Sequence, residues 1–297
     1  MIRRGVLGAL VLAIGIGAGP AAAAAAVDAR VVGTFAMVAH VTTAVNVRGE
    51  HRGQTLHRSW RVTPAACSRS ICRRLVLHRQ RSAGIVQRVT LRRVGAGRYS
   101  GSGVFYVALR CKGRTYLKGS RAPFGITVTV AGTVTVQGIR FARRLRGTYV
   151  NPSRSDATPC PLGPSHDAAR YSGSATSPAP GPPSASFTTD VAPGADSAQF
   201  SSTSQPGAGG ASIVAYAWNF GDPASGRSDT STASAPAHRF SQPGSYRVTL
   251  TVTDENGLAS SVTQLVTVPG AISSVSRTRA RSVTSRPADS RAGWTTA

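Results

Sequence analysis

The strongest constraint on the fold is a run of alternating side chains near the C-terminal end of the chain. From Tyr246 to Val252 every second residue is apolar, and the residues between them are Arg or Thr. A period of two is typical of a β-strand that buries one face. Residues 254–257 follow as Asp-Glu-Asn-Gly, and Asn-Gly favours the positive φ of a tight hairpin turn. The pattern predicts a strand, a turn and a returning strand that ends near Val268.

An earlier run, Ser212–Phe220, also alternates. Its larger residues are predicted to share one face, which carries Val214, Tyr216, Trp218 and Phe220. The small residues Ala215 and Ala217 are predicted to lie on the other face. We expect Trp218 to be the central aromatic residue of a small sandwich core.

Two motifs in this region resemble those of a known family. Residues 217–222 read Ala-Trp-Asn-Phe-Gly-Asp, and His238-Arg239-Phe240 precedes Gly-x-Tyr-x-Val-x-Leu-x-Val-x-Asp at 244–254. Residues 186–269 are therefore similar to the PKD domain, an immunoglobulin-like β-sandwich of extracellular proteins. The resemblance implies contact with proteins or carbohydrates at cell surfaces. It also implies a set of core signature residues, namely Trp218, Phe220, Gly221, Asp222, Tyr246 and Asp254.

The chain departs from the family pattern after Asp222. The pattern continues with another Gly, whereas this chain has Pro-Ala-Ser-Gly at 223–226, which predicts a longer turn. We expect Asp222 to bond backbone amides within that turn. Some PKD domains carry calcium, and Asp222, Asp229 and Asp254 are the residues to consider as ligands. Calcium prefers clustered acidic ligands, and no Asp-x-Asp-x-Asp spacing occurs here, so no metal is predicted.

Residues 1–26 have the features of a secretory signal peptide. A basic start with Arg3 and Arg4 precedes an apolar run over 6–18 and six alanines at 21–26. This order corresponds to the n-region, h-region and cleavage zone of such peptides. A twin-arginine signal and a retained membrane anchor are the alternatives. No second hydrophobic segment exists, so we expect a soluble mature chain, secreted or associated with the cell envelope.

The cysteines are even in number, as in an exported protein, and they are Cys67, Cys72, Cys111 and Cys160. Three pairings are possible. Cys67–Cys72 together with Cys111–Cys160 is the most natural pairing for a β-rich domain, and the longer bridge would stabilise it more. A zinc site assisted by His57 or His78 is the alternative, but the cysteine spacing does not fit one.

Residues 27–173 are predicted to form a β-rich domain. Short apolar runs separated by glycines cover 31–47, 59–62, 75–77, 86–94, 104–109, 126–136 and 139–150. They predict seven or eight strands in a disulfide-stapled antiparallel β-sandwich or barrel, so the whole chain is predicted to be all-β. The order of Trp60, the close cysteine pair, Tyr99 and Gly147-Thr148-Tyr149 resembles uncharacterised secreted actinobacterial β-domains. That resemblance implies no activity.

Composition predicts two further segments. Residues 174–185 are rich in Pro and Ser and are expected to form an extended linker before the PKD-like region. Residues 270–297 are rich in Ser, Thr and Arg without an apolar period, which predicts a disordered tail.

The positive charge belongs mainly to the first domain. Residues 27–172 contain 25 Arg and Lys against four Asp and Glu, whereas residues 183–270 contain three against six. A surface this cationic attracts polyanions through its long-range field and through counterion release. Its densest run supplies the candidate polyanion-binding residues Arg140, Arg143, Arg144 and Arg146, and the pairs at 73–74 and 92–93 are others. The bland alternative is incidental charge from a GC-rich genome. No nucleic-acid motif is present, so no specific nucleic-acid partner is expected.

The sequence offers little support for catalysis. It contains no His-Glu-x-x-His, Gly-x-Ser-x-Gly or P-loop motif. A paired-carboxylate hydrolase would require Glu50 to meet Asp156 or Asp167 in space. We therefore expect a non-enzymatic binding protein without a cofactor. Its expected partner is an extracellular polysaccharide, an anionic envelope polymer or a surface protein. The alternatives are a structural surface protein, or an exported hydrolase with a PKD accessory domain.

Overall fold

The computed structural model describes residues 26–80, 85–156 and 163–269. The predicted signal peptide, apart from its last residue, and the predicted tail lie outside these residues. Apart from one 3₁₀ segment, η2 (Pro223–Asp229), the regular elements of the described chain are strands, which confirms the all-β prediction. Helices long and apolar enough to cross a membrane are absent from the described residues.

The described residues divide into two compact units. One unit contains the residues up to Ser186 together with 204–216 and 251–261. The other unit contains 187–203, 217–250 and the residues from Val262 onward. The first unit is built mainly on one large antiparallel sheet, and the second contains most of two smaller sheets.

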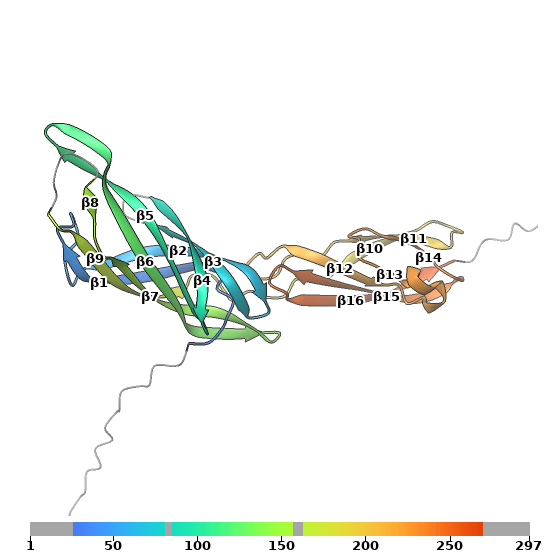
Figure 1. Ribbon diagram of the computed structural model, residues 1–297. Helices are drawn as coiled ribbons and strands as arrows, with labels where there is room; N and C mark the ends of the chain where they lie inside the picture. The colour runs from blue at the N-terminus through green and yellow to red at the C-terminus, as the bar shows by residue number, and fades with distance from the viewer. Residues whose placement is uncertain (1–25, 81–84, 157–162, 270–297) are drawn as a thin grey trace, which may run out of the picture. The chain divides into compact units, whose positions relative to one another are not determined.

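The large sheet closes on itself as an eight-stranded antiparallel barrel with one short extra strand (Figure 1). Its strands are β1 (Gly33–Val45), β2 (Thr55–Ser68), β3 (Ile71–Gln80), β4 (Val86–Gly95), β5 (Arg98–Cys111), β6 (Arg114–Val136), β7 (Ile139–Asn151), β8 (Ser155–Asp156) and β9 (His166–Ala175). The order around the ring is β5-β4-β3-β2-β1-β9-β7-β6, and β6 pairs with β5 again. The structure thus selects the barrel from the two architectures that the sequence predicted.

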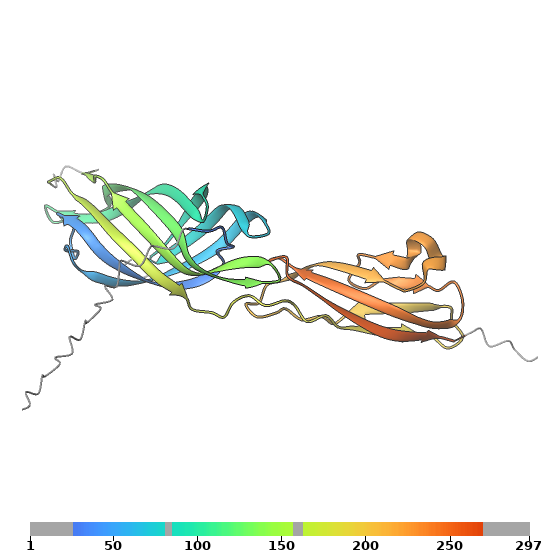
Figure 2. The same cartoon turned by 90° about the horizontal axis from the view of Figure 1, so that it is seen from below.

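Strand β9 completes the ring by pairing with both β1 and β7 (Figure 2). Ser172 lies opposite Val38 on one side and Arg146 on the other. The sequence analysis did not predict this strand, because residues 166–175 are mostly small or polar and lack the branched apolar residues that are typical of strands. The linker predicted for 174–185 begins inside β9, which ends at Ala175.

Large apolar side chains fill the interior of the barrel. Trp60, Phe35 and Tyr99 are at most 1% exposed and belong to one continuous core. Gly147 on β7 leaves room for the Trp60 ring, since a Cβ added there would lie 2.8 Å from its Cη2 atom. The interior is therefore packed with side chains along most of its length, as expected for a barrel of this strand number.

The PKD-like region forms two antiparallel sheets. One contains β10 (Phe187–Val191), β11 (Ser197–Ser202) and β14 (Ala237–Arg239). The other contains β13 (Thr230–Ser231), β12 (Ile213–Asn219), β15 (Gly244–Asp254) and β16 (Ala259–Val268), in that order. Gly181 and Ser184, which were assigned to the predicted linker, already form backbone hydrogen bonds with Ala208 and Gln205.

Aromatic rings from both of these sheets meet in one core. The ring centroid of Trp218 lies 5.1 Å from that of Phe187 and 5.5 Å from that of Phe200. The indole Nε1 of Trp218 donates to the carbonyl of Ala233 at 2.8 Å, so burial leaves no unpaired donor there. The predicted core role of Trp218 is confirmed. Val214 was wrongly predicted to share its buried face, because it is 61% exposed.

The cysteines agree with the predicted pairing where the structure describes them. Cys67 and Cys72 are opposite each other in the β2–β3 hairpin and form a disulfide. Cys111 is also disulfide-bonded. Its predicted partner, Cys160, lies outside the described residues.

Candidate functional site

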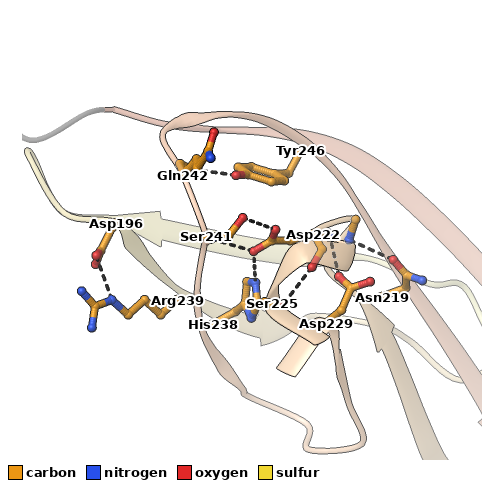
Figure 3. Close-up of polar contacts among 11 residues, drawn as sticks. Asp196, Asn219, Asp222, Ser225, Asp229, His238, Arg239, Ser241, Gln242 and Tyr246 are labelled. Atoms are coloured by element: carbon orange, nitrogen blue, oxygen red, sulfur yellow. Dashed lines mark hydrogen bonds and ion pairs between the residues drawn. The ribbon is translucent and has the colours of Figure 1, made fainter. Parts of the chain in front are cut away.

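The buried carboxylate of Asp222 is the centre of a polar cluster in the PKD-like region (Figure 3). The amide of Ser241 donates to Oδ2 at 2.8 Å, and its hydroxyl donates to Oδ1 at 2.5 Å. His238 places Nε2 3.3 Å from Oδ2, and its ring stacks on Phe220 with centroids 4.2 Å apart. The cluster joins the end of β12 to the segment that follows β14.

Two opposing effects act on the pKa of Asp222. Burial works to raise it, but the hydrogen bonds from Ser241 and His238 outweigh burial, so the pKa lies below its ordinary value. Asp222 is therefore ionised at neutral pH, and its oxygens are occupied by donors within the protein. This arrangement stabilises a fold and leaves little capacity for catalysis or metal binding.

The insertion after Asp222 forms the 3₁₀ segment η2, which confirms the prediction of a longer turn. The amide and hydroxyl of Ser225 both donate to the carbonyl of Asp222, at 2.9 and 2.7 Å. Oδ1 of Asp229 accepts from the amide of Asp222 at 2.6 Å. Gly221 adopts φ of 71°, in the left-handed region, and Asn219 Oδ1 accepts from its amide.

The remaining residues of the PKD signature are also structural. The hydroxyl of Tyr246 donates to the carbonyl of Gln242 at 2.6 Å. Asp254 is buried, and its Oδ1 accepts from the amides of Asn256 and Leu258, which shapes the turn between β15 and β16. Within the described part of the chain, no three His, Cys, Asp or Glu residues are grouped to hold a metal ion.

The outer face of β2, β3 and β4 carries two rows of basic side chains. In the first row His78 lies opposite Arg61 on one side and Arg88 on the other. In the second row Arg74 lies opposite Arg92, and both are exposed. Strands β1 to β7, all within the described residues, contain no Asp or Glu. Like charges directly opposite each other destabilise a sheet, so the Arg74–Arg92 pair is unfavourable unless an anion lies near it.

A shallow groove of about 610 Å³ runs along the first row. Its walls are formed by Ser59, Arg61, Thr63, His78, Gln80 and Val86. None of Arg61, His78 and Arg88 was predicted from the sequence to bind a polyanion, and His78 was considered there only as a zinc ligand. Each of these three residues is adjacent in its strand to a buried residue, so alternation predicts that its side chain points away from the core. Only the register between the strands shows that the three side chains are neighbours.

The structure separates the four arginines predicted to bind polyanions. Arg140 and Arg143 use their guanidinium groups within the protein, donating to the carbonyls of Asp28 at 3.0 Å and Ser177 at 2.6 Å. Arg144 and Arg146 are exposed on the outer face of β7. Their cross-strand neighbours on β9 are uncharged serines. The four arginines are therefore close together in the sequence but differ in the structure, since two donate hydrogen bonds within the protein and two are exposed to solvent.

Acidic residues of the barrel are engaged by arginines. Arg93 forms a two-pronged ion pair with Asp28, with distances of 2.9 and 2.7 Å. The hydrogen bond from Arg93 holds the pKa of Asp28 below its usual range, despite the opposing effect of burial. Arg154 pairs with Asp167 at 2.6 Å, and both side chains are largely buried. Two of the few acidic groups of the domain are therefore already in ion pairs with arginines.

A cavity of about 50 Å³ lies inside the barrel. Glu50 and Asp167 both line it, so the structure brings together one carboxylate pair that the hydrolase alternative requires. Asp167 is held by Arg154, however, and the cavity is far smaller than the roughly 300 Å³ of a typical ligand pocket.

Comparison with known proteins found matches to the second region. A family model described as PKD domain matches residues 178–269. The PKD1 domain of Vibrio anguillarum Epp is 27% identical, with a TM-score of 0.27, over 31% of this chain and 99% of that domain. The PKD1 domain from the Vibrio cholerae metalloprotease PrtV is 35% identical, with a TM-score of 0.25. This match covers 30% of this chain and 98% of that domain. No curated protein matches the chain. Residues 178–269 of this chain are a PKD domain.

Proposed function

We propose that the chain is an extracellular or envelope-associated binding protein without catalytic activity. Its barrel contacts anionic polymers through the outer face of β2, β3 and β4, and its PKD domain contacts a protein or a carbohydrate. The N-terminal sequence features and the disulfide Cys67–Cys72 support an exported protein.

The observation that carries this proposal is the alignment of basic side chains across adjacent strands, which includes one directly opposed pair of arginines. Arg74 faces Arg92, and His78 lies between Arg61 and Arg88, on three strands without an acidic residue. An incidental excess of arginine would be expected to scatter over the surface. Here the register places cations side by side on adjacent strands, and an anionic polymer laid across them would neutralise several at once.

The groove beside the first row supports the same assignment. It runs past Arg61 and His78 and is otherwise lined by hydroxyl, amide and apolar groups. Such a lining offers both charge and neutral hydrogen-bond partners to a phosphate- or carboxylate-bearing polymer chain. An extended polymer fits an open groove of this kind better than a compact ligand does.

The test is binding of the full chain to polyphosphate and to polygalacturonate over a salt series. We expect affinity to fall steeply with salt in the wild type. The double variant Arg74→Gln/Arg92→Gln should lower the slope of log K against log salt by about 2, which is one unit for each arginine replaced. The matched control Arg98→Gln/Arg121→Gln removes the same charge from exposed sites on β5 and β6.

A parallel variant tests the run predicted from sequence. Arg144→Gln/Arg146→Gln changes the two exposed arginines of β7, and we expect it to behave like the control pair. A larger loss from this variant than from Arg74→Gln/Arg92→Gln would move the site to β7. Absence of binding at low salt would overturn the polyanion proposal and favour a structural surface protein.

The exposed face of β15 and β16 supports the contact role of the PKD domain. Three pairs of hydroxyls bridge these strands: Ser245 with Thr267 at 2.9 Å, Thr249 with Thr263 at 2.8 Å, and Thr251 with Ser261 at 2.7 Å. The resulting surface is mainly polar and is ordered by its own hydrogen bonds, and it also carries the exposed side chains of Arg247 and Leu265. A glycan array with Thr249→Ala/Thr263→Ala as the comparison variant would test carbohydrate contact, and a signal unchanged by that variant would exclude this face.

A further inference from the structure

The cavity inside the barrel is lined by groups that packing alone does not require. Besides the two carboxylates, its walls include three arginines, Arg58, Arg79 and Arg154, and the aromatic rings of Trp60, Tyr149 and Tyr171. Its volume of about 50 Å³ exceeds the 10–15 Å³ that one water molecule needs on this measure. The space suits a few waters or one small charged group.

Arg79 is a buried cation held by an amide and two aromatic rings. It is 5% exposed, and its Nε donates to Oε1 of Gln87 at 2.7 Å. Its guanidinium carbon lies 4.6 Å from the ring centroids of both Phe124 and Tyr149. The aromatic rings offset part of the cost of burying this charge, and the hydroxyl of Tyr149 accepts a hydrogen bond from Arg79. These partners are all neutral, so none of them cancels the charge of Arg79.

Arg154 supplies an unsatisfied donor in the same wall. One of its terminal nitrogens pairs with Asp167, but its Nε is buried and has no hydrogen-bond partner among the described residues. Buried donors are rarely left unpaired in folded proteins, so each such atom requires a ligand, an ion or a water. A hydrogen-bond acceptor with negative charge would suit both arginines.

We propose that this cavity binds a small oxyanion, a carboxylate or phosphate group, between Arg79 and Arg154. The planar guanidinium group matches the geometry of both oxyanions and binds them through paired hydrogen bonds. Burial raises the pKa of Tyr149, so its phenol stays neutral and adds no negative charge to the site. The arginines in the wall outnumber Glu50 and Asp167, which leaves a net positive charge for the ligand.

This site is separate from the polymer-binding face proposed above. The cavity lies inside the ring, whereas Arg74 and Arg92 are exposed on its outer surface. A small cavity admits a free anion or a single terminal group and excludes the body of a polymer. Either site can therefore fail its test without affecting the other.

Trp60 provides a reporter, because its ring lines the cavity. The experiment follows the tryptophan indole signals of the full ¹⁵N-labelled chain during titration with sodium acetate and with sodium phosphate. Ionic strength is held constant with sodium chloride, and Trp60→Phe identifies the signal. We expect a saturable shift for Trp60 and none for Trp218. If the Trp60 shift saturates only with acetate, the ligand group is a carboxylate. If it saturates only with phosphate, the ligand group is a phosphate.

Variants assign the shift to the two arginines. Arg79→Gln and Arg154→Gln should each weaken binding about tenfold or more, since each removes a charge-assisted hydrogen bond. Arg74→Gln/Arg92→Gln should leave it unchanged. If Arg79→Gln fails to fold, judged by the dispersion of its amide signals, Arg154→Gln carries the test. Non-saturable shifts equal to those in chloride, or unchanged affinity in the variants that fold, would overturn the proposal.

Discussion

Arg74 of β3 and Arg92 of β4 are direct cross-strand partners on the outer face of the barrel. Their side chains carry the same charge, and none of the strands β2 to β4 holds an acidic residue that could separate them. Such a pair costs stability in the free protein, and under the proposed function it contributes affinity for the bound polyanion. Stability and function should therefore respond to substitution in opposite directions.

Arg92→Glu should turn a repulsive pair into an attractive one. We expect the free energy of unfolding at low salt to rise by about 0.5–1 kcal/mol, while affinity for polyphosphate falls. The control is Arg98→Glu, which changes the net charge equally but lies opposite Thr129 on β6. Urea unfolding at two salt concentrations measures the effect. Equal stabilisation by both variants would show that net charge, rather than the pair, is responsible.

Gly147→Ala should destabilise the barrel by about 1–3 kcal/mol. The added methyl would press on the Trp60 ring from 2.8 Å, and close-packed cores tolerate overpacking poorly. Gly125→Ala is the control, because a Cβ there has no neighbour within 4 Å. Thermal unfolding of both variants checks the prediction. Similar stability of the two would mean that the Trp60 ring moves aside at little cost.

Asp222→Asn should destabilise the PKD domain by about 2 kcal/mol or more, because it removes a buried charge that accepts hydrogen bonds from Ser241 and His238. Asp196→Asn is the control, since Asp196 forms an exposed pair with Arg239 and should change stability by less than about 1 kcal/mol. Denaturant unfolding, followed by the fluorescence of Trp218, measures both. A small effect at Asp222 would contradict its role as the centre of the cluster.

The same carboxylate predicts a pH dependence. The pKa of Asp222 in the folded domain is lower than its ordinary value of about 3.9 in an unfolded chain. Its contribution to stability is therefore complete above about pH 4 and is lost as pH falls through the lowered pKa. Unfolding curves between pH 2 and 6 should show this loss in the wild type and a weaker one in Asp222→Asn. Parallel curves would assign the acid sensitivity to other groups.

The short disulfide should contribute modestly. Cys67 and Cys72 close a loop with a sequence separation of five, for which loop-closure entropy gives about 2 kcal/mol. The double variant Cys67→Ser/Cys72→Ser should therefore fold with stability reduced by about that amount, as urea unfolding would show. A loss of folding would indicate that the bridge also guides the pairing of β2 with β3.

Local pattern was sufficient for much of the PKD domain. The alternation from Tyr246 to Val252 predicted β15, and Trp218 was correctly assigned to the core because aromatic residues at inward positions dominate small sandwiches. Val214 broke the pattern, since alternation gives the side of a strand but not how far a second sheet extends over it. The disulfide Cys67–Cys72 followed from proximity along the chain.

The sequence pattern predicts the cavity less well than it predicts the PKD domain. Arg79 has the same parity as the buried Leu75 and Leu77 on β3, which marks it as an inward cation. Nothing local shows that the rings of Phe124 and Tyr149, on strands β6 and β7, contact its guanidinium group. The arginines of Arg140–Arg146 show the opposite case. They are close together in the sequence, but their side chains do not share one environment in the structure.

The amino-acid sequence by itself determined the strand class, the PKD domain and the concentration of charge in the first domain, because these depend on composition and on a period of two. The tertiary structure alone decided that the first domain closes as a barrel through β9, that Arg74 faces Arg92, and that Arg79 and Arg154 share a cavity. Closure of the barrel depends on the pairing of β9 with strands distant in the chain, and the Arg74–Arg92 pair depends on the register between the neighbouring strands β3 and β4. A shift of register by one residue would turn the strand residues Arg74, Arg79 and Arg92 to the other face.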